Sequence, residues 1–376
     1  MTTFPSQVRT FVIPRKGRPD PVLLLCTGLL LCVGLVMVFD ATYFYSAERT
    51  GNPFWLFFKQ LAAACVGLGV FLFFLELPAS TLERWAPVGL LLASVLLLLV
   101  WSPELGEARH GARRWIAVRG KVTLQPVEFV KVALVCYLAR SIARKGERIR
   151  SFSRGILPPT IVVAVLSACL IAQPDYGNAA LLWVLLLAML FAGGARLSHL
   201  AALGGSAGVG LGAVLVMAPY RTARLLSFLD PWDDVTRTDF QLVQSFLAFG
   251  SGGLYGNGLG SGRQRFFLPE VHTDFLFALL GEETGLVGAF LVLGLFLLLA
   301  LRGFRTSLRH PTPFGGMLAF GVTVGFFSNV LVNLGVVLGL IPTKGLPLPL
   351  MSYGGSALVG TLAQLGMLGA LSRSTG

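Results

Sequence analysis

Residues 21–39 form an apolar run without a single charged side chain, and similar runs recur along the chain. A helix needs about 20 apolar residues to cross the hydrocarbon core of a bilayer, so this first run has spanning length. Of the 376 residues, 55% are hydrophobic and 13% are charged, whereas about 25% are charged in an average soluble domain. The sequence therefore predicts a membrane protein, with its first apolar run retained as a helix and not cleaved as a signal peptide.

Apolar windows along the chain predict an all-α polytopic membrane protein of about ten transmembrane helices. The helices are expected near 21–41, 55–76, 84–101, 125–143, 154–172, 177–193, 197–218, 274–302, 313–340 and 353–372. A single transmembrane domain, 21–372, is expected between an N-terminal tail (1–20) and a C-terminal tail (373–376). The Gly-rich segment 219–273 is predicted as a large extracytoplasmic loop between helices seven and eight, and long loops of this kind are commonly functional.

The distribution of basic residues predicts that both termini are cytoplasmic. Short cytoplasmic loops carry an excess of Lys and Arg, and this orientation places inside the basic residues of 1–20, 144–154, 302–309 and 373–376. The segment 102–124 breaks the rule, because it is assigned outside yet carries five basic residues: Arg109, Arg113, Arg114, Arg119 and Lys121. An anionic ligand would explain a cationic loop there. The net charge of +12 thus reflects membrane orientation, and no nucleic acid is expected.

Ionisable residues inside spanning segments are costly and are functional candidates by default. Glu128 and Lys131 lie at i, i+3 near the start of the fourth helix, where their side chains can meet on one face; a structural ion pair is the alternative interpretation. Asp175 lies in the turn QPDYG and either caps the following helix or serves the site. The five cysteines lie in apolar stretches without metal-site or disulfide spacing.

Asp274 is the most suggestive carboxylate, since it stands directly before an apolar segment. It is either a helix N-cap or, if burial raises its pKa, a base near neutral pH. His272 is equally compatible with a solvated loop. Of Glu282 and Glu283, at least one should face protein.

The segment 341–356 contains three prolines and repeated glycines, so it cannot form a regular helix. Irregular backbone at membrane depth survives only where protein or a water-filled cavity satisfies its polar groups. Lys344 and Ser352 lie in this segment. The predicted orientation places all these candidates at the outer face, which favours one shared cavity.

The sequence resembles the SEDS family (shape, elongation, division and sporulation) from about residue 20 to 372. Its motifs are GARRWI (111–116), QPVEFVK (125–131), QPDYG (173–177), LPEVHTDF (268–275) and SYGGS (352–356). PTKGL (342–346) and GGLYGNGLG (252–260) resemble the division branch more than the elongation branch, whose members usually replace the Thr-Lys pair. Thr284 and Tyr176 depart from the family's usual Leu.

The resemblance implies a glycosyltransferase that polymerises lipid II, the disaccharide-pentapeptide carried on undecaprenyl pyrophosphate, during division. Asp274 matches the family's essential carboxylate, and Arg113 and Arg114 are the first choices for binding the pyrophosphate. The other expected substrate-binding residues are Glu128, Lys131, Asp175, His272, Lys344 and Ser352. No cofactor is required by the residues; a divalent cation (Mg or Mn) is possible chemistry, and no metal ligand is identified.

The family resemblance further implies a class B penicillin-binding protein as membrane partner, together with other divisome proteins. Three alternatives stay open: an elongation-type polymerase, a flippase for the lipid-linked precursor, and a non-catalytic divisome scaffold. Polymer made in detergent would exclude flipping, because detergent provides no second compartment.

Overall fold

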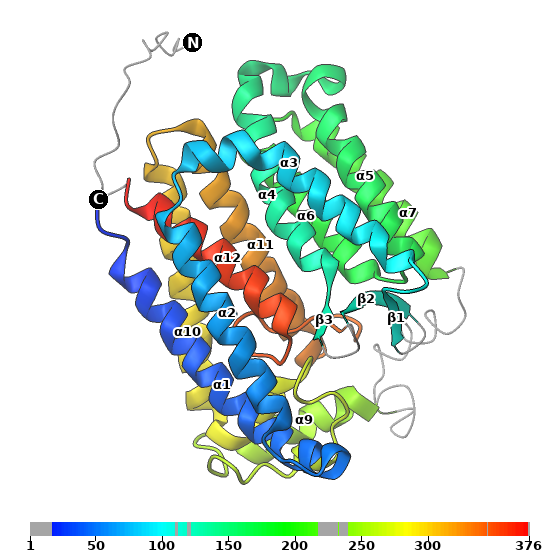
Figure 1. Ribbon diagram of the computed structural model, residues 1–376, viewed down its shortest axis with the longest axis vertical. Coiled ribbons are helices and arrows are strands. Elements are labelled where there is room, and N and C mark those ends of the chain that lie inside the picture. The colour runs from blue at the N-terminus through cyan, green and yellow to red at the C-terminus, as the bar shows by residue number, and fades with distance from the viewer. Residues whose placement is uncertain are drawn as a thin grey trace.

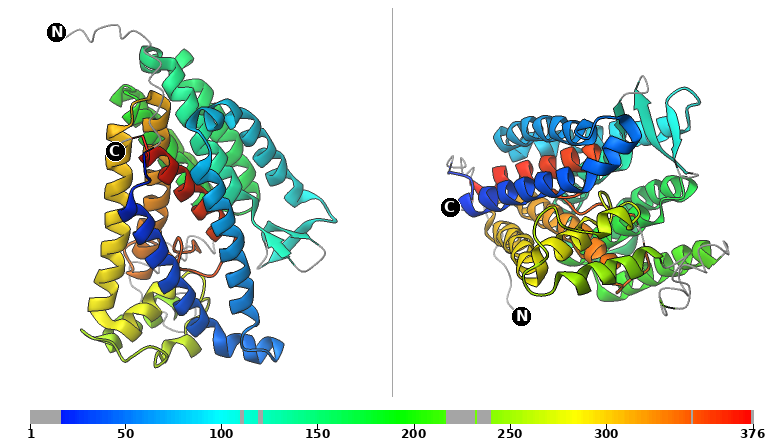
Figure 2. Two further views of the ribbon diagram at one scale, coloured as in Figure 1. Left: turned by 60° about the vertical axis from the view of Figure 1, so that its left-hand side comes forward. Right: turned by 90° about the horizontal axis from the view of Figure 1, so that it is seen from below.

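The computed structural model describes residues 17–109, 112–118, 122–216, 232, 240–343 and 345–374. Long helices run between the two ends of the molecule (Figures 1 and 2). The first half contains α1 (Pro21–Thr50), α2 (Trp55–Glu76), α3 (Ala79–Leu98), α4 (Pro126–Lys145), α5 (Leu157–Ala172), α6 (Tyr176–Ala192) and α7 (Leu197–Val216). The second half contains α9 (Phe240–Gly252), α10 (Leu276–Arg309), α11 (Pro313–Val337) and α12 (Gly355–Ser372). Short helical turns are η1 (Leu99–Trp101), η2 (Gly146–Arg150), η3 (Phe152–Ile156) and η4 (Gln264–Phe266).

The helical, polytopic architecture predicted from the sequence is confirmed. Among the described residues, seven helical segments are long and apolar enough to cross a membrane: Pro21–Thr50, Trp55–Glu76, Ala79–Trp101, Phe152–Ala172, Leu276–Arg309, Pro313–Val337 and Gly355–Ser372. The helix Tyr176–Ala192 is apolar but shorter. Ten spans would require α4, α6 and α7 as well, so that number stays a prediction.

A small sheet forms in the segment that was expected to be only a cationic loop. Strands β1 (Gly106–Arg109), β2 (Ala112–Val118) and β3 (Val122–Leu124) form an antiparallel sheet in the order β1-β2-β3. Ile116 pairs with Gly106 on one side and Leu124 on the other, and a bulge falls between Glu107 and Ala108. Polar and apolar residues do not alternate over a long enough stretch of 112–118 for the sequence pattern alone to distinguish a strand from a loop.

The predicted outer loop 219–273 contains helical structure. Helix α9 and η4 lie within it, whereas 219–231 and 233–239 fall outside the described residues. Helix α10 is interrupted at Gly285, whose φ of 66° and ψ of −167° divide it into 276–284 and 286–309. A residue with a side chain would be strained at that φ, so Gly285 permits the sharp bend.

The first and last helices meet at one end of the molecule, here called the terminal end. The backbone N–H of Asp20 donates to Ser372 Oγ (2.9 Å), and the Asp20 carboxylate pairs with Arg302 (3.4 Å). Arg373 also pairs with Glu76 there. Helix α9 lies at the opposite end, here called the loop end (Figure 1).

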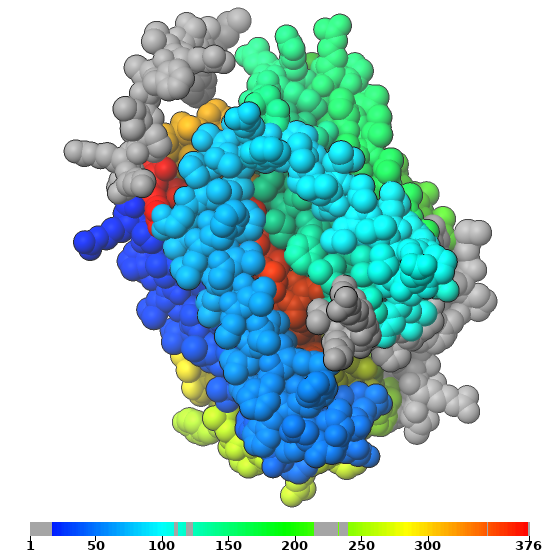
Figure 3. All heavy atoms as spheres, viewed as in Figure 1, coloured from blue at the N-terminus to red at the C-terminus, as the bar shows by residue number. Residues whose placement is uncertain are grey.

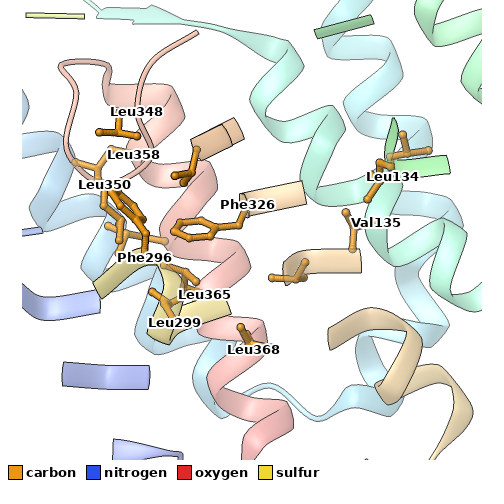
Figure 4. Close-up of a cluster of buried hydrophobic side chains, with 14 of the residues drawn as sticks. Leu134, Val135, Phe296, Leu299, Phe326, Leu348, Leu350, Leu358, Leu365 and Leu368 are labelled. Atoms are coloured by element: carbon orange, nitrogen blue, oxygen red, sulfur yellow. The ribbon is translucent and has the colours of Figure 1, made fainter. Parts of the chain in front are cut away.

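Helices α10, α11, α12 and α4 enclose a continuous apolar core. Phe296 and Phe326 pack at 5.9 Å between ring centroids, and Leu365 and Leu358 of α12 lie beside them (Figure 4). Leu348, from the irregular segment before α12, also lies in this cluster. In the space-filling view, a strip of α12 shows at the floor of a furrow between α2 and the α3–α4 region (Figure 3). The core thus holds the irregular segment in place at the loop end.

Candidate functional site

Asp274 lies just before α10 and is fixed by contacts with two other segments. Its backbone N–H donates to Glu270 O (3.1 Å), and its backbone carbonyl accepts from Asn333 Nδ2 (2.8 Å) on α11. Asn333 Nδ2 also donates to Leu346 O (2.7 Å). The carboxylate lies against Gly345, since a Cβ added there would stand 2.6 Å from Asp274 Oδ2. The N-cap interpretation is not supported, because Phe275 occupies that position.

The electrostatic surroundings of Asp274 favour proton uptake. Burial, and then the nearby Glu270 carboxylate, raise the pKa of Asp274 to about 7. Both effects disfavour the ionised form. A carboxylate that titrates near neutral pH is suited to accept a proton from a reacting hydroxyl.

His272 is buried, not a solvated loop residue. Its ring lies between those of Tyr45 (5.0 Å) and Tyr353 (5.6 Å between centroids). Its backbone carbonyl accepts from the N–H of Tyr353 (2.8 Å). Burial lowers the pKa of His272. The nearby Glu270 carboxylate raises this pKa, and the Arg49 charge lowers it. The lowered pKa favours the neutral ring, and ring packing joins the Asp274 loop to the segment before α12.

Side chains of the protein form hydrogen bonds with backbone groups of the irregular segment before α12, as expected from the sequence. Ser352 Oγ accepts from the N–H of Leu348 (2.9 Å). On α2, Gln60 donates to Ser352 O (3.2 Å) and accepts from Gly354 N–H (3.1 Å). Ser352 is buried and its hydroxyl is engaged with the backbone, so its first role is to shape this segment.

Glu128 and Lys131 form the expected ion pair, with 2.8 Å between Lys131 Nζ and Glu128 Oε1. Both side chains are largely buried. The start of α4 is joined to α12, because Gln125 N–H donates to Ser356 Oγ (2.9 Å). Lys131 also lines a cavity of about 20 Å³ with Asn329 and other residues of α6, α11 and α12, which is room for a single water.

Asp175 and Arg114 belong to a second group, at the turn between α5 and α6. Asp175 caps α6 and accepts from Asn178 Nδ2 (2.8 Å). Arg114 donates from Nε to Gln173 O (3.0 Å) and from Nη2 to Pro174 O. Much of its guanidinium is thus committed to the turn. Arg113 is exposed on the same strand, which leaves it the more accessible of the two arginines.

Structure and sequence differ on how the candidates are gathered. His272, Asp274 and Ser352 lie in one connected group, to which the Glu128–Lys131 pair is joined through α12. Asp175 and Arg114 lie in the second group. Lys344 lies outside the described residues, although its neighbour Gly345 touches Asp274.

Two site residues, Gln60 and Asn333, were not identified from the sequence. Both are buried polar residues within apolar helices, and that placement was a usable signal because such residues are expensive in a membrane. Nothing in the sequence indicates which backbone carbonyls they bind.

A buried charge cluster joins α1 to the loop that precedes Asp274. Arg265 pairs with Asp40 Oδ1 (2.6 Å) and Glu283 Oε1 (3.3 Å). Glu282 accepts from the N–H groups of Arg263 (2.8 Å) and Gln264 (3.0 Å). Both Glu282 and Glu283 are buried, so the expectation that at least one faces protein is confirmed. An open pocket of about 260 Å³ lies beside Asp40 and Arg265.

The described residues do not supply a ready metal site. Within the part of the chain that the structure describes, no three His, Cys, Asp or Glu side chains are grouped to hold an ion. A divalent cation at Asp274 would have to take most of its ligands from a substrate. The described donor set therefore does not fit a resident metal.

These features define a multi-pass helical membrane protein in which buried titratable side chains gather around Asp274. A family model described as "Cell cycle protein", whose name joins FtsW, RodA and SpoVE, matches residues 21–376. The chain belongs to this family, the SEDS proteins.

Relatives and solved structures support the same assignment over nearly the whole chain. "Probable peptidoglycan glycosyltransferase FtsW" of Geobacter metallireducens is 41% identical over 362 residues, covering 93% of this chain and 94% of the relative. "Stage V sporulation protein E" of Bacillus subtilis is 39% identical over 360 residues, with 96% and 98% covered.

Among solved structures, a chain from "Structural coordination of polymerization and crosslinking by a peptidoglycan synthase complex" is 28% identical with a TM-score of 0.77, covering 94% of this chain and 98% of that one. The RodA crystal structure from Thermus thermophilus is 28% identical with a TM-score of 0.69, covering 95% and 97%. The higher identity to the Geobacter FtsW agrees with the division-branch resemblance of the motifs.

Proposed function

We propose that this chain is a peptidoglycan glycosyltransferase that polymerises lipid II into glycan strands during cell division. The proposal rests on the state of Asp274. The pKa of its partly buried carboxylate is raised to about 7, and its backbone carbonyl accepts a hydrogen bond from Asn333 on α11. Relatives named as peptidoglycan glycosyltransferases match over more than nine tenths of the chain.

In the proposed reaction, Asp274 acts as general base. Its carboxylate accepts the proton of the attacking sugar hydroxyl as that oxygen forms a bond to the anomeric carbon of the second substrate. The bond from that carbon to the pyrophosphate oxygen breaks, and undecaprenyl pyrophosphate leaves with the bonding electrons. A base with a pKa near the working pH is the most effective for such a transfer.

Cationic side chains stabilise the departing pyrophosphate in this scheme. Arg113 suits the task, because it is exposed and a guanidinium binds phosphate oxygens in a bidentate manner. Lys131 and Lys344 are further candidates. Arg114 is better assigned to holding the 173–174 turn, since its Nε and Nη2 already donate to backbone carbonyls. A divalent ion carried by the pyrophosphate is compatible with the scheme.

The proposed orientation places the terminal end in the cytoplasm and the loop end, with Asp274, outside the cytoplasmic membrane. The positive-inside rule supports it, because η2 and η3 carry Arg148, Arg150 and Arg154. The furrow between α2 and the α3–α4 region, floored by α12, is the proposed seat of the isoprenoid tail (Figure 3).

The proposed partner is a class B penicillin-binding protein, which would supply peptide cross-linking, within an assembly of other divisome proteins. The structural neighbour that comes from a peptidoglycan synthase complex supports an assembly of this kind. This chain would then contribute the polymerising site alone.

The test is polymerisation of lipid II by the purified protein in detergent, with and without the partner, comparing Asp274→Asn with the wild type. Asp274→Asn should abolish polymer while leaving folding and partner binding intact. Glu147→Gln is the matched control, because it removes an exposed carboxylate at the terminal end, and this variant should be fully active. Polymer from the Asp274→Asn protein would contradict the proposal. No polymer from the wild type with its partner would favour a flippase or a scaffold.

A further inference from the structure

Asn333 is the point at which α11 contacts both segments that form the Asp274 site. It is almost fully buried in the second half of a mostly apolar helix. Its single amide nitrogen donates to Asp274 O at 2.8 Å and to Leu346 O at 2.7 Å. These two carbonyls belong to segments about 70 residues apart, so one side chain bonds to both of them.

The Leu346 segment in turn contacts the Asp274 carboxylate. Gly345, next to Leu346, lies so close to Asp274 Oδ2 that it has no room for a Cβ. Asn333 therefore fixes the backbone of Asp274 on one side and the surface under its carboxylate on the other. A shift of either segment would move the carboxylate relative to a bound hydroxyl.

Burial makes the two hydrogen bonds consequential. A buried carbonyl that loses its donor is left without a hydrogen bond and without water, which destabilises the folded state. The two segments would therefore rearrange until their carbonyls find new donors. Catalytic groups need placement within fractions of an ångström, and misplacement by about 1 Å can cost on the order of 100-fold in rate. The effect of losing Asn333 should therefore appear in the chemical step.

We infer that Asn333 is a positioning residue for the reaction, holding Asp274 and the 345–346 backbone in register through a shared amide. This inference rests on the proposed function, in which Asp274 is the base. Asn333 acts through Asp274 and needs no contact with the substrate.

The test compares Asn333→Leu, which keeps the shape and removes both donors, with Asn333→Ser, whose hydroxyl can serve at most one carbonyl. Polymerisation of lipid II is measured across pH 5.5–9, with kcat and KM separated. We expect kcat to fall about 10- to 100-fold in Asn333→Leu and less in Asn333→Ser, with KM changed less than about threefold. The acidic limb of the rate profile should move to lower pH, because a carboxylate released from its packed position is better solvated.

Ser245→Ala is the matched control. Ser245 is also buried and donates to a carbonyl at the end of α11, Val337 O at 2.7 Å, but it has no bond to Asp274. It should leave both kcat and the acidic limb unchanged. An equal loss of kcat in Ser245→Ala and Asn333→Leu with an unmoved limb would assign Asn333 a merely structural role and overturn the inference.

Two further outcomes separate this inference from the proposed function. If Asp274→Asn is inactive while Asn333→Leu matches the wild type, the positioning role is wrong and the proposed base survives. If Asp274→Asn still polymerises, the proposed function is wrong whatever Asn333→Leu does. Should Asn333→Leu fail to fold, Asn333→Ser decides: an unmoved acidic limb overturns the inference.

Discussion

The carboxylate of Asp274 occupies the space that a Cβ would need at Gly345, a residue 71 positions later in the chain. A methyl group at Gly345 would stand 2.6 Å from Oδ2, well inside van der Waals contact. The backbone of Gly345 does not require the left-handed region, so the substitution Gly345→Ala strains no dihedral angle. The carboxylate would have to rotate away, and we expect kcat for polymerisation to fall about 10- to 100-fold.

Thermal unfolding should separate this effect from misfolding. Gly345→Ala should unfold within a few degrees of the wild type, because the displaced group is the end of a side chain. Gly69→Ala, on α2 with open space around the added methyl, is the control and should be fully active. Normal kcat in Gly345→Ala would show that the carboxylate position seen here is not the reactive one.

The raised pKa of Asp274 predicts a stability change with a definite sign. With a pKa of about 7 in the folded protein and about 3.9 when unfolded, the folded state binds more protons between these values. Stability contributed by this site is therefore present below pH 4 and is lost as pH rises toward 7. Since each pKa unit corresponds to about 1.4 kcal/mol, Asp274→Asn should raise stability at pH 8 by up to about 4 kcal/mol and change it little at pH 4.

Unfolding of both proteins followed across pH 4–8 measures this difference. The activity of the wild type should rise with pH through about 7, because only the ionised carboxylate accepts a proton. A stability difference that is flat with pH would place the folded-state pKa of Asp274 near its ordinary value and remove the electrostatic basis for the base assignment.

The Glu128–Lys131 pair allows architecture and function to be separated. Glu128→Gln leaves a buried ammonium without its partner and should cost about 3–5 kcal/mol, whereas replacing both by apolar residues of similar size is often neutral. We expect Glu128→Leu combined with Lys131→Met to fold like the wild type. If Lys131 stabilises the leaving group, as proposed, the double variant should lose polymerisation. Thermal unfolding and lipid II polymerisation measure the two effects; full activity in the double variant would assign the pair to architecture alone.

The sequence was sufficient for the helical membrane fold because the relevant signal is local. A run such as 21–39 excludes water as its solvent whatever it packs against. Helix ends depend on more distant contacts. Helix α1 continues to Thr50, nine residues beyond the expected end, because Ser46 and Asn52 bond across its last turn. The bend at Gly285 was not predicted, since glycine is also common in straight membrane helices.

The charged residues of the candidate site could be selected from the sequence, but most of their contacts could not. Asp274 and the Glu128–Lys131 pair could be selected because charge near lipid is costly. The roles of Arg114 and Asn333 were not predictable, because each depends on backbone carbonyls brought near only by folding: Gln173 O for Arg114, and Asp274 O with Leu346 O for Asn333. His272 was open to a solvated interpretation for the same reason, since the flanking Tyr45 and Tyr353 are remote in sequence.

The Arg265 cluster gives the largest predicted effect on stability away from Asp274. The Glu283 side chain is fully buried and those of Arg265 and Asp40 are mostly buried, so Arg265→Leu would leave the two carboxylates close together without a cation. Removing one partner of a buried ion pair costs about 3–5 kcal/mol. Thermal unfolding of Arg265→Leu should therefore show a large drop in the midpoint.

Charge removal should reverse much of that drop. Adding Asp40→Asn and Glu283→Gln to Arg265→Leu leaves no buried charge in the cluster, and we expect recovery of more than half of the lost stability. Arg144→Leu is the control, because it breaks a pair with Glu83 whose arginine side chain is 58% exposed, and such pairs contribute about 1 kcal/mol or less. If Arg265→Leu costs no more than Arg144→Leu, the cluster does not hold α1 to the loop before Asp274. If the triple variant unfolds as early as Arg265→Leu alone, the lost contacts of the guanidinium, and not the unpaired carboxylates, account for the instability.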